Sequence, residues 1–216
     1  KMSIHKLAGL PAPEELLINV NDLIEDYYNL HPDVKVTSQK VAFGTSGHRG
    51  TSSKMSFNED HVLAVSQAIC EYRKKNGITG PLYLGKDTHA LSDVAQISAL
   101  EVFAANGIEV RYQSDMGYTP TPVISHAILT YNFDKQKGLS DGVVITPSHN
   151  PPQDGGYKYN PPSAGPAGTE ITNIVQERAN AILANQLKDV KRIPLEKALG
   201  LKTVQAYDFM SPYIKD

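Results

Sequence analysis

The chain has 216 residues and a formal net charge of −2, from 21 Lys and Arg against 23 Asp and Glu. Hydrophobic residues make up 40% of the chain and charged residues 20%, which is typical of a globular protein rather than a disordered one. This charge balance provides no global basic field for nucleic acid or an anionic membrane, and no apolar run approaches the ~18 residues of a membrane span. We therefore expect neither a nucleic-acid partner nor a membrane partner.

Cysteine content and the N-terminal residues indicate the compartment. Cys70 is the single cysteine, which excludes an intrachain disulfide and a cysteine metal cluster. It lies on an apolar helical stripe, where a buried small hydrophobe is expected rather than a reactive thiol. Residues 1–13 lack the apolar core of a signal peptide, so we expect a cytoplasmic, reducing location.

Residues 1–40 are predicted to form a helical extension. Pro13 and the two glutamates after it are a good helix start, and apolar residues recur at helical spacing over residues 16–28. The helix is expected to end at His31 and Pro32, because the residue before a proline is disfavoured in helical conformation.

Helix and strand signals alternate from residue 41 onwards. Strands are predicted over residues 41–43, 81–85, 108–112 and 142–146, and helices after residue 59, over 92–105 and over 121–131. Ser56 and Glu59 have the spacing of a capping box, and Ser92 is the expected N-cap of the next helix. This alternation predicts an α/β fold, a layered mixed sheet flanked by helices.

The fold class also predicts where a ligand binds. Ligands of such sheets lie at the carboxyl ends of the strands. Polar loops follow predicted strands at residues 44–50, 86–89 and 147–158, so we expect them to share one face. Residues 151–168, rich in Pro and Gly, are expected to be an ordered surface loop, and residues 170–183 a helix. A further periodic pattern begins at residue 204, so residues 201–216 are interpreted as the start of a following segment of a larger protein.

A serine directly follows the last buried strand, in residues 146–152 (TPSHNPP). The prolines fix φ and stiffen this loop, which would hold Ser148 on a rigid base. By itself the segment is also typical of an ordinary polar turn. A hydrolase pair of Ser148 with His149 is disfavoured, because adjacent side chains rarely meet and the glycines of a nucleophile elbow are replaced by Thr146 and Asn150.

Two further segments carry cationic side chains. In residues 44–50 (GTSGHRG) three glycines allow the backbone to approach an anion, and Arg49 is a forked phosphate donor. In residues 154–160 (DGGYKYN) the glycines allow the loop to fold back, so that Lys158 can meet Ser148. A glycine-rich turn and a solvated lysine are the alternatives for each segment taken alone. Residues 80–87 (GPLYLGKD) are not a P-loop, because the Ser/Thr after the lysine is missing.

Together these segments resemble the α-D-phosphohexomutase family, and residues 85–92 and 155–162 resemble its bacterial phosphoglucomutase branch. The resemblance covers nearly the whole chain from about residue 16. It implies that residues 41–200 are the phosphoserine-bearing first domain of a multi-domain enzyme. It further implies that Ser148 carries the phosphoryl group, that Arg49 and Lys158 lie beside it, and that His149 belongs to the site. Thr45 and Ser46 are expected to contact the substrate.

The resemblance also implies an activity and a metal. It implies interconversion of glucose 1-phosphate and glucose 6-phosphate through a glucose 1,6-bisphosphate intermediate, which also acts as activator. Mannose and glucosamine phosphates remain alternative substrates, and a non-catalytic phosphate-binding domain remains an alternative function. Mg²⁺ is expected to bind the Ser148 phosphate, but the acidic metal loop, the sugar loop and the phosphate clamp of the family are not found in this sequence. These parts, and hence most of the metal ligands, are expected on further domains of the same polypeptide, and residues 1–216 are expected to be inactive alone.

Overall fold

A computed structural model describes residues 6–44 and 47–216 of the chain. Its strands are β1 (His48–Thr51), β2 (Leu82–Lys86), β3 (Val110–Gln113), β4 (Asp141–Ile145), β5 (Asp154–Asn160) and β6 (Val204–Tyr207). Its α-helices are α1 (Val20–Asn29), α2 (Glu59–Lys75), α3 (Ser92–Ala105), α4 (Thr121–Asn132), α5 (Thr169–Ala184), α6 (Leu195–Leu199) and α7 (Met210–Lys215). None of the described helices is both long and apolar enough to span a bilayer.

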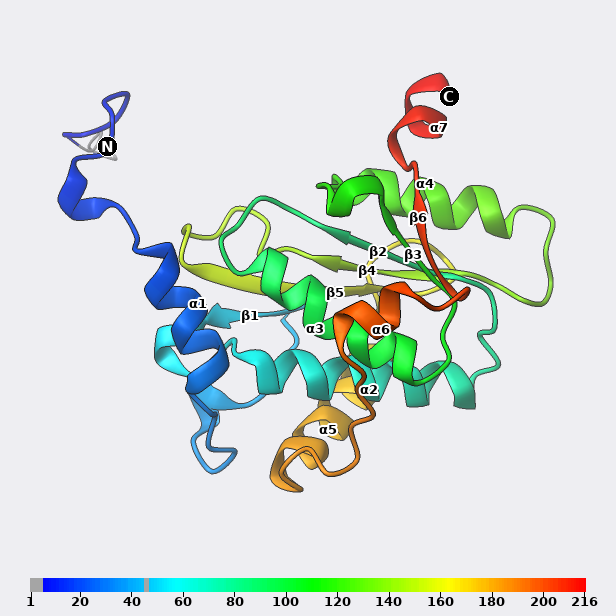
Figure 1. The fold of residues 1–216 in the computed structure, drawn as a ribbon, viewed down its shortest axis with the longest axis horizontal. Helices are drawn as coiled ribbons and strands as arrows, with labels where there is room; N and C mark the ends of the chain where they lie inside the picture. Colours follow the sequence, from blue (N-terminus) through cyan, green and yellow to red (C-terminus); the bar gives the residue numbers. More distant parts are fainter. Residues whose placement is uncertain (1–5, 45–46) are drawn as a thin grey trace.

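The strands form one mixed sheet of order β1-β5-β4-β2-β3-β6. Strands β4, β2, β3 and β6 are mutually parallel, whereas β5 is antiparallel to both of its neighbours, β4 and β1. Helices α2, α3, α5 and α6 cover one face and α4 covers the other, so the molecule has three layers (Figure 1). The predicted layered α/β sheet is therefore confirmed.

Side-chain alternation along the central strands explains the two covered faces. Leu82, Leu84 and Val143 belong to the core under α2 and α3, whereas Tyr83 and Val144 belong to the core under α4. Successive residues of a strand point to opposite faces, so a strand covered on both faces reads as a continuous apolar run. That is why β2 and β4 were readable from the sequence as buried strands.

The strand predicted over residues 41–43 is wrong. Phe43 forms only an isolated bridge with His48, and the strand at this edge is β1, which begins at His48. The backbone N–H of Val41 donates to Asn180 Oδ1 at 2.9 Å, and that of Phe43 donates to Gln176 Oε1 at 2.7 Å. Side chains of α5 thus take the hydrogen bonds that a neighbouring strand would have taken.

The surface loop predicted over residues 151–168 is also wrong in its first half. Residues 154–160 form β5, which lies between β4 and β1 and pairs with both. Gly156 permits this, because a Cβ at that position would lie 2.3 Å from the Thr146 carbonyl oxygen. The glycines read as loop-formers are needed for a close strand contact.

Three predicted helix starts need correction. The first α-helix begins at Val20 rather than after Pro13, because Asn19 Oδ1 accepts from the backbone N–H of Asn21 at 3.1 Å. Helix α2 is capped at Asn58, whose N–H donates to His61 Nδ1 at 3.0 Å, and not at Ser56. Ser92 is the first residue of α3 and not its N-cap.

The last residues of the chain join the same sheet. Strand β6 pairs in parallel with β3, with Val110 opposite Val204. The division of the chain into residues 1–40, 41–200 and 201–216 stays a prediction.

A buried ion pair ties α2 to the central sheet. The Arg73 guanidinium contacts the Asp141 carboxylate at the start of β4, and both side chains are fully buried. Arg73 Nη2 also donates to the Gly80 carbonyl at 2.6 Å, and the Tyr159 hydroxyl donates to Asp141 Oδ2 at 2.6 Å. The pair therefore joins a helix to two strands beneath the surface.

Replacing one partner of this pair is predicted to be severely destabilising. Arg73→Met leaves the Asp141 carboxylate buried without its cation, and we expect a loss of about 3–5 kcal/mol in the free energy of unfolding. Urea denaturation followed by circular dichroism measures this. Lys74→Met, at the exposed neighbouring position, is the control and is expected to change stability by no more than about 0.5 kcal/mol. An Arg73→Met loss as small as that of the control contradicts the prediction.

Candidate active site

Ser148 lies at the carboxyl end of a central strand. Strand β4 ends at Ile145, and Ser148 is exposed at the tip of the loop that follows. Its φ is +67°, in the left-handed region that a non-glycine residue rarely occupies. Its backbone N–H donates to Thr146 Oγ1 at 2.9 Å. Strained backbone that is held in place by hydrogen bonds is often found at functional sites.

Lys158 meets Ser148 because β5 runs back along β4. Tyr157 pairs with Ile145 and Lys158 with Val144, so Lys158 lies beside the last residues of β4, from where its long side chain reaches Ser148. Lys158 Nζ donates to Ser148 Oγ at 2.5 Å. The pKa of Lys158 is lowered by partial burial and then by the positive charge of Arg49, while the charge of Asp87 opposes the shift. The residue pair expected from the sequence is thus brought into contact.

Arg49 approaches the same place from the edge strand β1. It pairs with Gly156 in the register between β1 and β5, and its side chain is exposed. Gly47 allows this loop to lie against β5, because a Cβ there would lie 2.5 Å from the Tyr157 carbonyl oxygen and 2.8 Å from Lys158 Cγ. Lys158 thus contacts the serine hydroxyl, and Arg49 lies close enough for its charge to act on Lys158, an arrangement suited to a phosphate or another anion.

Three other residues were predicted for the site: His149, Thr45 and Ser46. His149 is exposed, and its ring is hydrogen bonded to none of the described residues. Thr45 and Ser46 lie outside the described residues. The roles of all these residues stay predictions, since geometry alone shows position and not function.

Asp87 is a residue of the site to which the sequence analysis assigned no role. Its carboxylate accepts from Ser92 Oγ and Thr146 Oγ1, both at 2.6 Å, and from the backbone N–H and Nδ1 of His89 at 3.0 and 2.8 Å. Burial raises the pKa of Asp87, but these hydrogen bonds outweigh burial and leave the pKa below its ordinary value. The sequence offered one indication of a role for Asp87: it directly follows β2, in a polar loop at the predicted ligand-binding face.

His48, inside the glycine-rich motif, is a support rather than a proton donor. Its ring is buried, 5.9 Å from the Phe57 ring and 5.1 Å from the His61 ring by centroids. Burial first, and then the neighbouring His61, lower the pKa of His48 to about 3. A neutral, buried imidazole packs β1 against α2 and does not exchange protons with a ligand near neutral pH.

The described residues do not build a magnesium site by themselves. Among residues 6–44 and 47–216 no three acidic, His or Cys side chains are grouped to hold a metal ion. Of the two carboxylates near the serine loop, Asp87 already accepts four hydrogen bonds and Asp154 accepts from Asn150 Nδ2 at 2.9 Å. Magnesium usually needs carboxylate ligands besides phosphate, and the described residues group no such set of ligands at Ser148.

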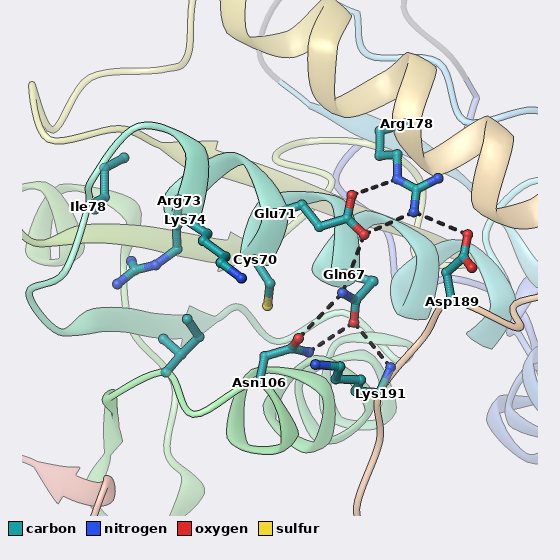
Figure 2. Close-up of a pocket in the computed structure, with 11 residues that line it drawn as sticks. Gln67, Cys70, Glu71, Arg73, Lys74, Ile78, Asn106, Arg178, Asp189 and Lys191 are labelled. Atoms are coloured by element: carbon teal, nitrogen blue, oxygen red, sulfur yellow. Dashed lines mark hydrogen bonds and ion pairs between the residues drawn. The ribbon is translucent and has the colours of Figure 1, made fainter.

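A cavity of about 520 Å³ lies elsewhere, between α2, α5 and residues 189–191 (Figure 2). It is on the side of the amino ends of the strands, because Ile78 and Ile108 in its wall precede β2 and β3. Several of its polar groups are paired with one another; for example, Arg178 Nε lies 2.6 Å from Glu71 Oε2. Burial raises the pKa of the Cys70 thiol to about 12, so this thiol is not a nucleophile. The cavity provides no groups for the chemistry considered at Ser148.

The charges around Lys158 predict a specific change in its titration. Lys158 loses its proton at lower pH than an ordinary lysine, because burial and Arg49 disfavour its charged form. Arg49→Ala is therefore expected to raise the pKa of Lys158, and Asp87→Asn to lower it further. NMR titration of the Lys158 Cε and Hε resonances measures both shifts. Arg178→Ala, in which the arginine pairs with Glu71 rather than Lys158, is the control. An Arg49→Ala shift no larger than that control shift means that Arg49 does not act on Lys158.

Comparison with known proteins shows which family the chain is similar to. Residues 40–186 match the family model described as phosphoglucomutase/phosphomannomutase, alpha/beta/alpha domain I. The chain is 58% identical over 214 residues to a phosphoglucomutase of Komagataeibacter xylinus, covering 99% of this chain and 39% of that protein. It is 30% identical over 141 residues to a phosphoglucosamine mutase of Thermus thermophilus, covering 65% and 29%.

A solved structure shows the same fold. The chain superposes on the Paramecium phosphoprotein pp63/parafusin, in its open form, with a TM-score of 0.65 at 22% identity, covering 86% of this chain and 35% of that one. The chain thus spans well under half the length of each of these relatives. On the family match over residues 40–186 and the identity over nearly its whole length, the chain belongs to the phosphoglucomutase/phosphomannomutase family and contains its alpha/beta/alpha domain I.

Proposed function

We propose that this chain is the phosphoserine-bearing part of a phosphoglucomutase, an isomerase that interconverts glucose 1-phosphate and glucose 6-phosphate. The observation that carries the proposal is the contact of Lys158 Nζ with Ser148 Oγ at 2.5 Å, at the carboxyl end of β4 and with Arg49 nearby. The 58% identity to the Komagataeibacter xylinus phosphoglucomutase supports glucose as the sugar.

The proposed chemistry moves one phosphoryl group at a time. The bond between phosphorus and Ser148 Oγ breaks while a bond forms to a free hydroxyl of the sugar monophosphate; that hydroxyl loses its proton and the departing Ser148 Oγ gains one, and the second step reverses this exchange. The resulting glucose 1,6-bisphosphate then returns its other phosphoryl group to Ser148 Oγ. Free glucose 1,6-bisphosphate activates the enzyme by phosphorylating a serine that has lost its phosphate.

The cations near Ser148 have an electrostatic role in this scheme. Phosphoserine carries about −1.5 to −2 charges, so Lys158 and Arg49 stabilise both the phosphoenzyme and the charge on the transferring group. His149, Thr45 and Ser46 are proposed to contact the substrate. Magnesium, held by the serine phosphate and by ligands outside this chain, would add further charge neutralisation when bound.

The remaining parts of the proposal concern the whole protein. The missing metal and sugar loops are proposed to lie on further domains of the same polypeptide, since the similar Komagataeibacter xylinus enzyme is much longer than this chain. A cytoplasmic location agrees with a sugar phosphate as substrate. No nucleic-acid or membrane partner is proposed.

A mutase for another sugar phosphate is the second candidate. The phosphoglucosamine mutase of Thermus thermophilus, at 30% identity, and the family description itself support it. Coupled assays with the 1-phosphates of glucose, mannose and glucosamine distinguish these substrates by their kcat/KM ratios. A domain of another class, which binds phosphate without turnover, is excluded by sustained turnover in any of the three assays.

Residues 1–216 alone are predicted to show no mutase turnover above background, because the sugar and metal loops are missing. A coupled assay with glucose 1-phosphate, magnesium and trace glucose 1,6-bisphosphate tests this. The longer polypeptide that carries this chain is the positive control. Sustained turnover by residues 1–216 means that the active site is complete without further domains.

Ser148→Ala in that longer polypeptide is predicted to abolish turnover, because alanine has no oxygen to carry the phosphoryl group. Its stability should change by no more than roughly 0.5 kcal/mol, as for other surface substitutions. Arg49→Ala and Lys158→Ala should each lower kcat by about 10²–10³-fold, as is typical when an electrostatic donor is removed. Lys202→Ala, exposed before β6 at the other end of the sheet, is the matched control for a lost lysine.

Peptide mapping of the isolated enzyme should find phosphate on Ser148 and none on Ser53, an exposed serine outside the site. Normal turnover by Ser148→Ala, or phosphate that maps to another residue, would show the proposed mechanism to be wrong.

A further inference from the structure

The Asp87 carboxylate is linked to both ends of the loop that carries Ser148. At the start of the loop it accepts from Thr146 Oγ1 at 2.6 Å. At the end of the loop it acts through His89, whose Nδ1 is 2.8 Å from Asp87 Oδ2 and whose Nε2 is 3.1 Å from the Asn150 carbonyl oxygen. The backbone N–H of Asp87 also donates to the Ile145 carbonyl at 3.0 Å, which fixes Asp87 to the end of β4.

The hydrogen bonds of the Thr146 hydroxyl can run in only one direction in this arrangement. It accepts from the backbone N–H of Ser148 at 2.9 Å, and that group can only donate. Its own proton is therefore directed to the Asp87 carboxylate, which can only accept when it is ionised. Thr146 is buried, so water does not replace either partner. A continuous chain of hydrogen bonds runs from Asp87 through Thr146 to the backbone of Ser148.

His89 forms the second link. Both of its ring nitrogens face oxygen acceptors, the Asp87 carboxylate and the Asn150 carbonyl. The ring therefore bridges the Asp87 carboxylate and the backbone at the end of the serine loop. Asn150 is in turn attached to Asp154, at the start of β5, by a bond of 2.9 Å. The end of the serine loop is thus tied to the strand that carries Lys158.

These contacts have a consequence for the left-handed backbone of Ser148. A non-glycine residue at φ +67° is held there by its surroundings and not by its own preference. The Thr146 hydroxyl is the group that binds the Ser148 N–H in this conformation, and Asp87 orients that hydroxyl. Losing either group would let the loop tip relax away from Lys158.

We propose that Asp87 is a positioning residue that acts through Thr146 and His89 to hold residues 146–150 with Ser148 Oγ facing Lys158. Its carboxylate is hydrogen bonded to Ser92, Thr146 and His89, and not to the Ser148 side chain. The inference rests on the proposed function, since it concerns the reactivity of the serine that carries the phosphoryl group. A displacement of about 1 Å at a reacting atom can cost on the order of 10²-fold in rate.

The test uses kinetics of the longer polypeptide that carries this chain. Asp87→Asn and Thr146→Val are expected to lower kcat by about 10–100-fold with little change in KM, the range seen when the partner that orients an active group is lost. Thr146→Ser keeps the hydroxyl and is expected to retain most of the activity. The double variant Asp87→Asn/Thr146→Val is expected to lose little more than Asp87→Asn alone, because the Thr146 hydroxyl is oriented by Asp87.

The matched control is Asp93→Asn. Asp93 is an aspartate near the start of α3 that pairs with Lys86 and not with the serine loop. Its loss removes the same charge from the same end of the sheet, and kcat is expected to stay close to that of the unmodified enzyme. A merely structural role for Asp87 is distinguished by urea denaturation: loss of stability without the kcat loss, or failure of Thr146→Ser to rescue activity, overturns the proposal.

Amide hydrogen exchange on the unmodified protein covers the case in which variants do not fold. The Ser148 N–H is expected to exchange more slowly than that of exposed His149, because Thr146 accepts a hydrogen bond from it. Equal and fast exchange at both positions contradicts the proposal. The two hypotheses fail separately: normal turnover of Ser148→Ala contradicts the proposed function. An inactive Ser148→Ala together with fully active Asp87→Asn and Thr146→Val contradicts only the role of Asp87.

Discussion

The antiparallel pairing of β5 with β4 is the constraint on which the site depends. Strand β4 is parallel to β2 and delivers Ser148 at its carboxyl end, while β5 returns along it with Tyr157 opposite Ile145. That register places Lys158 opposite Val144, near the end of β4, from where its Nζ reaches the hydroxyl of Ser148, ten residues earlier in the chain. A slip of one residue would turn the Lys158 side chain to the other face of the sheet, because strand side chains alternate with a period of two.

The same pairing brings in the edge strand. Because β5 has β1 on its other side, Arg49 is held next to Gly156 and its charge acts on Lys158. Two cations held close together repel each other, and this repulsion is part of why the pKa of Lys158 is lowered. An anion on Ser148 Oγ would relieve the repulsion. The site is therefore arranged electrostatically for a group with more than one negative charge.

The loop of residues 146–150 has exposed side chains at its tip and buried or half-buried groups that hold its backbone. Ser148, His149 and Arg49 are exposed to solvent, whereas Thr146 is buried and Asp87 is half-buried. Preorganised donors and cations act on transition-state charge without having to rearrange during the reaction. A network that fixes the loop backbone, and leaves only side-chain tips in contact with solvent, is consistent with that requirement.

The local pattern of the sequence determined the α/β fold class, the buried strands β2 and β4, and the serine at the end of β4, because buried strands covered on both faces leave continuous apolar runs. It did not determine β5 or β1. The glycines and polar residues of 154–160 read as a loop, since the packing of Gly156 on Thr146 is visible only when two distant segments lie side by side. The place of residues 41–43 depended likewise on hydrogen bonds from α5, more than a hundred residues away. The sequence also did not predict the proposed role of Asp87, because its partners come together only when the parallel strands β2 and β4 end at the same edge of the sheet.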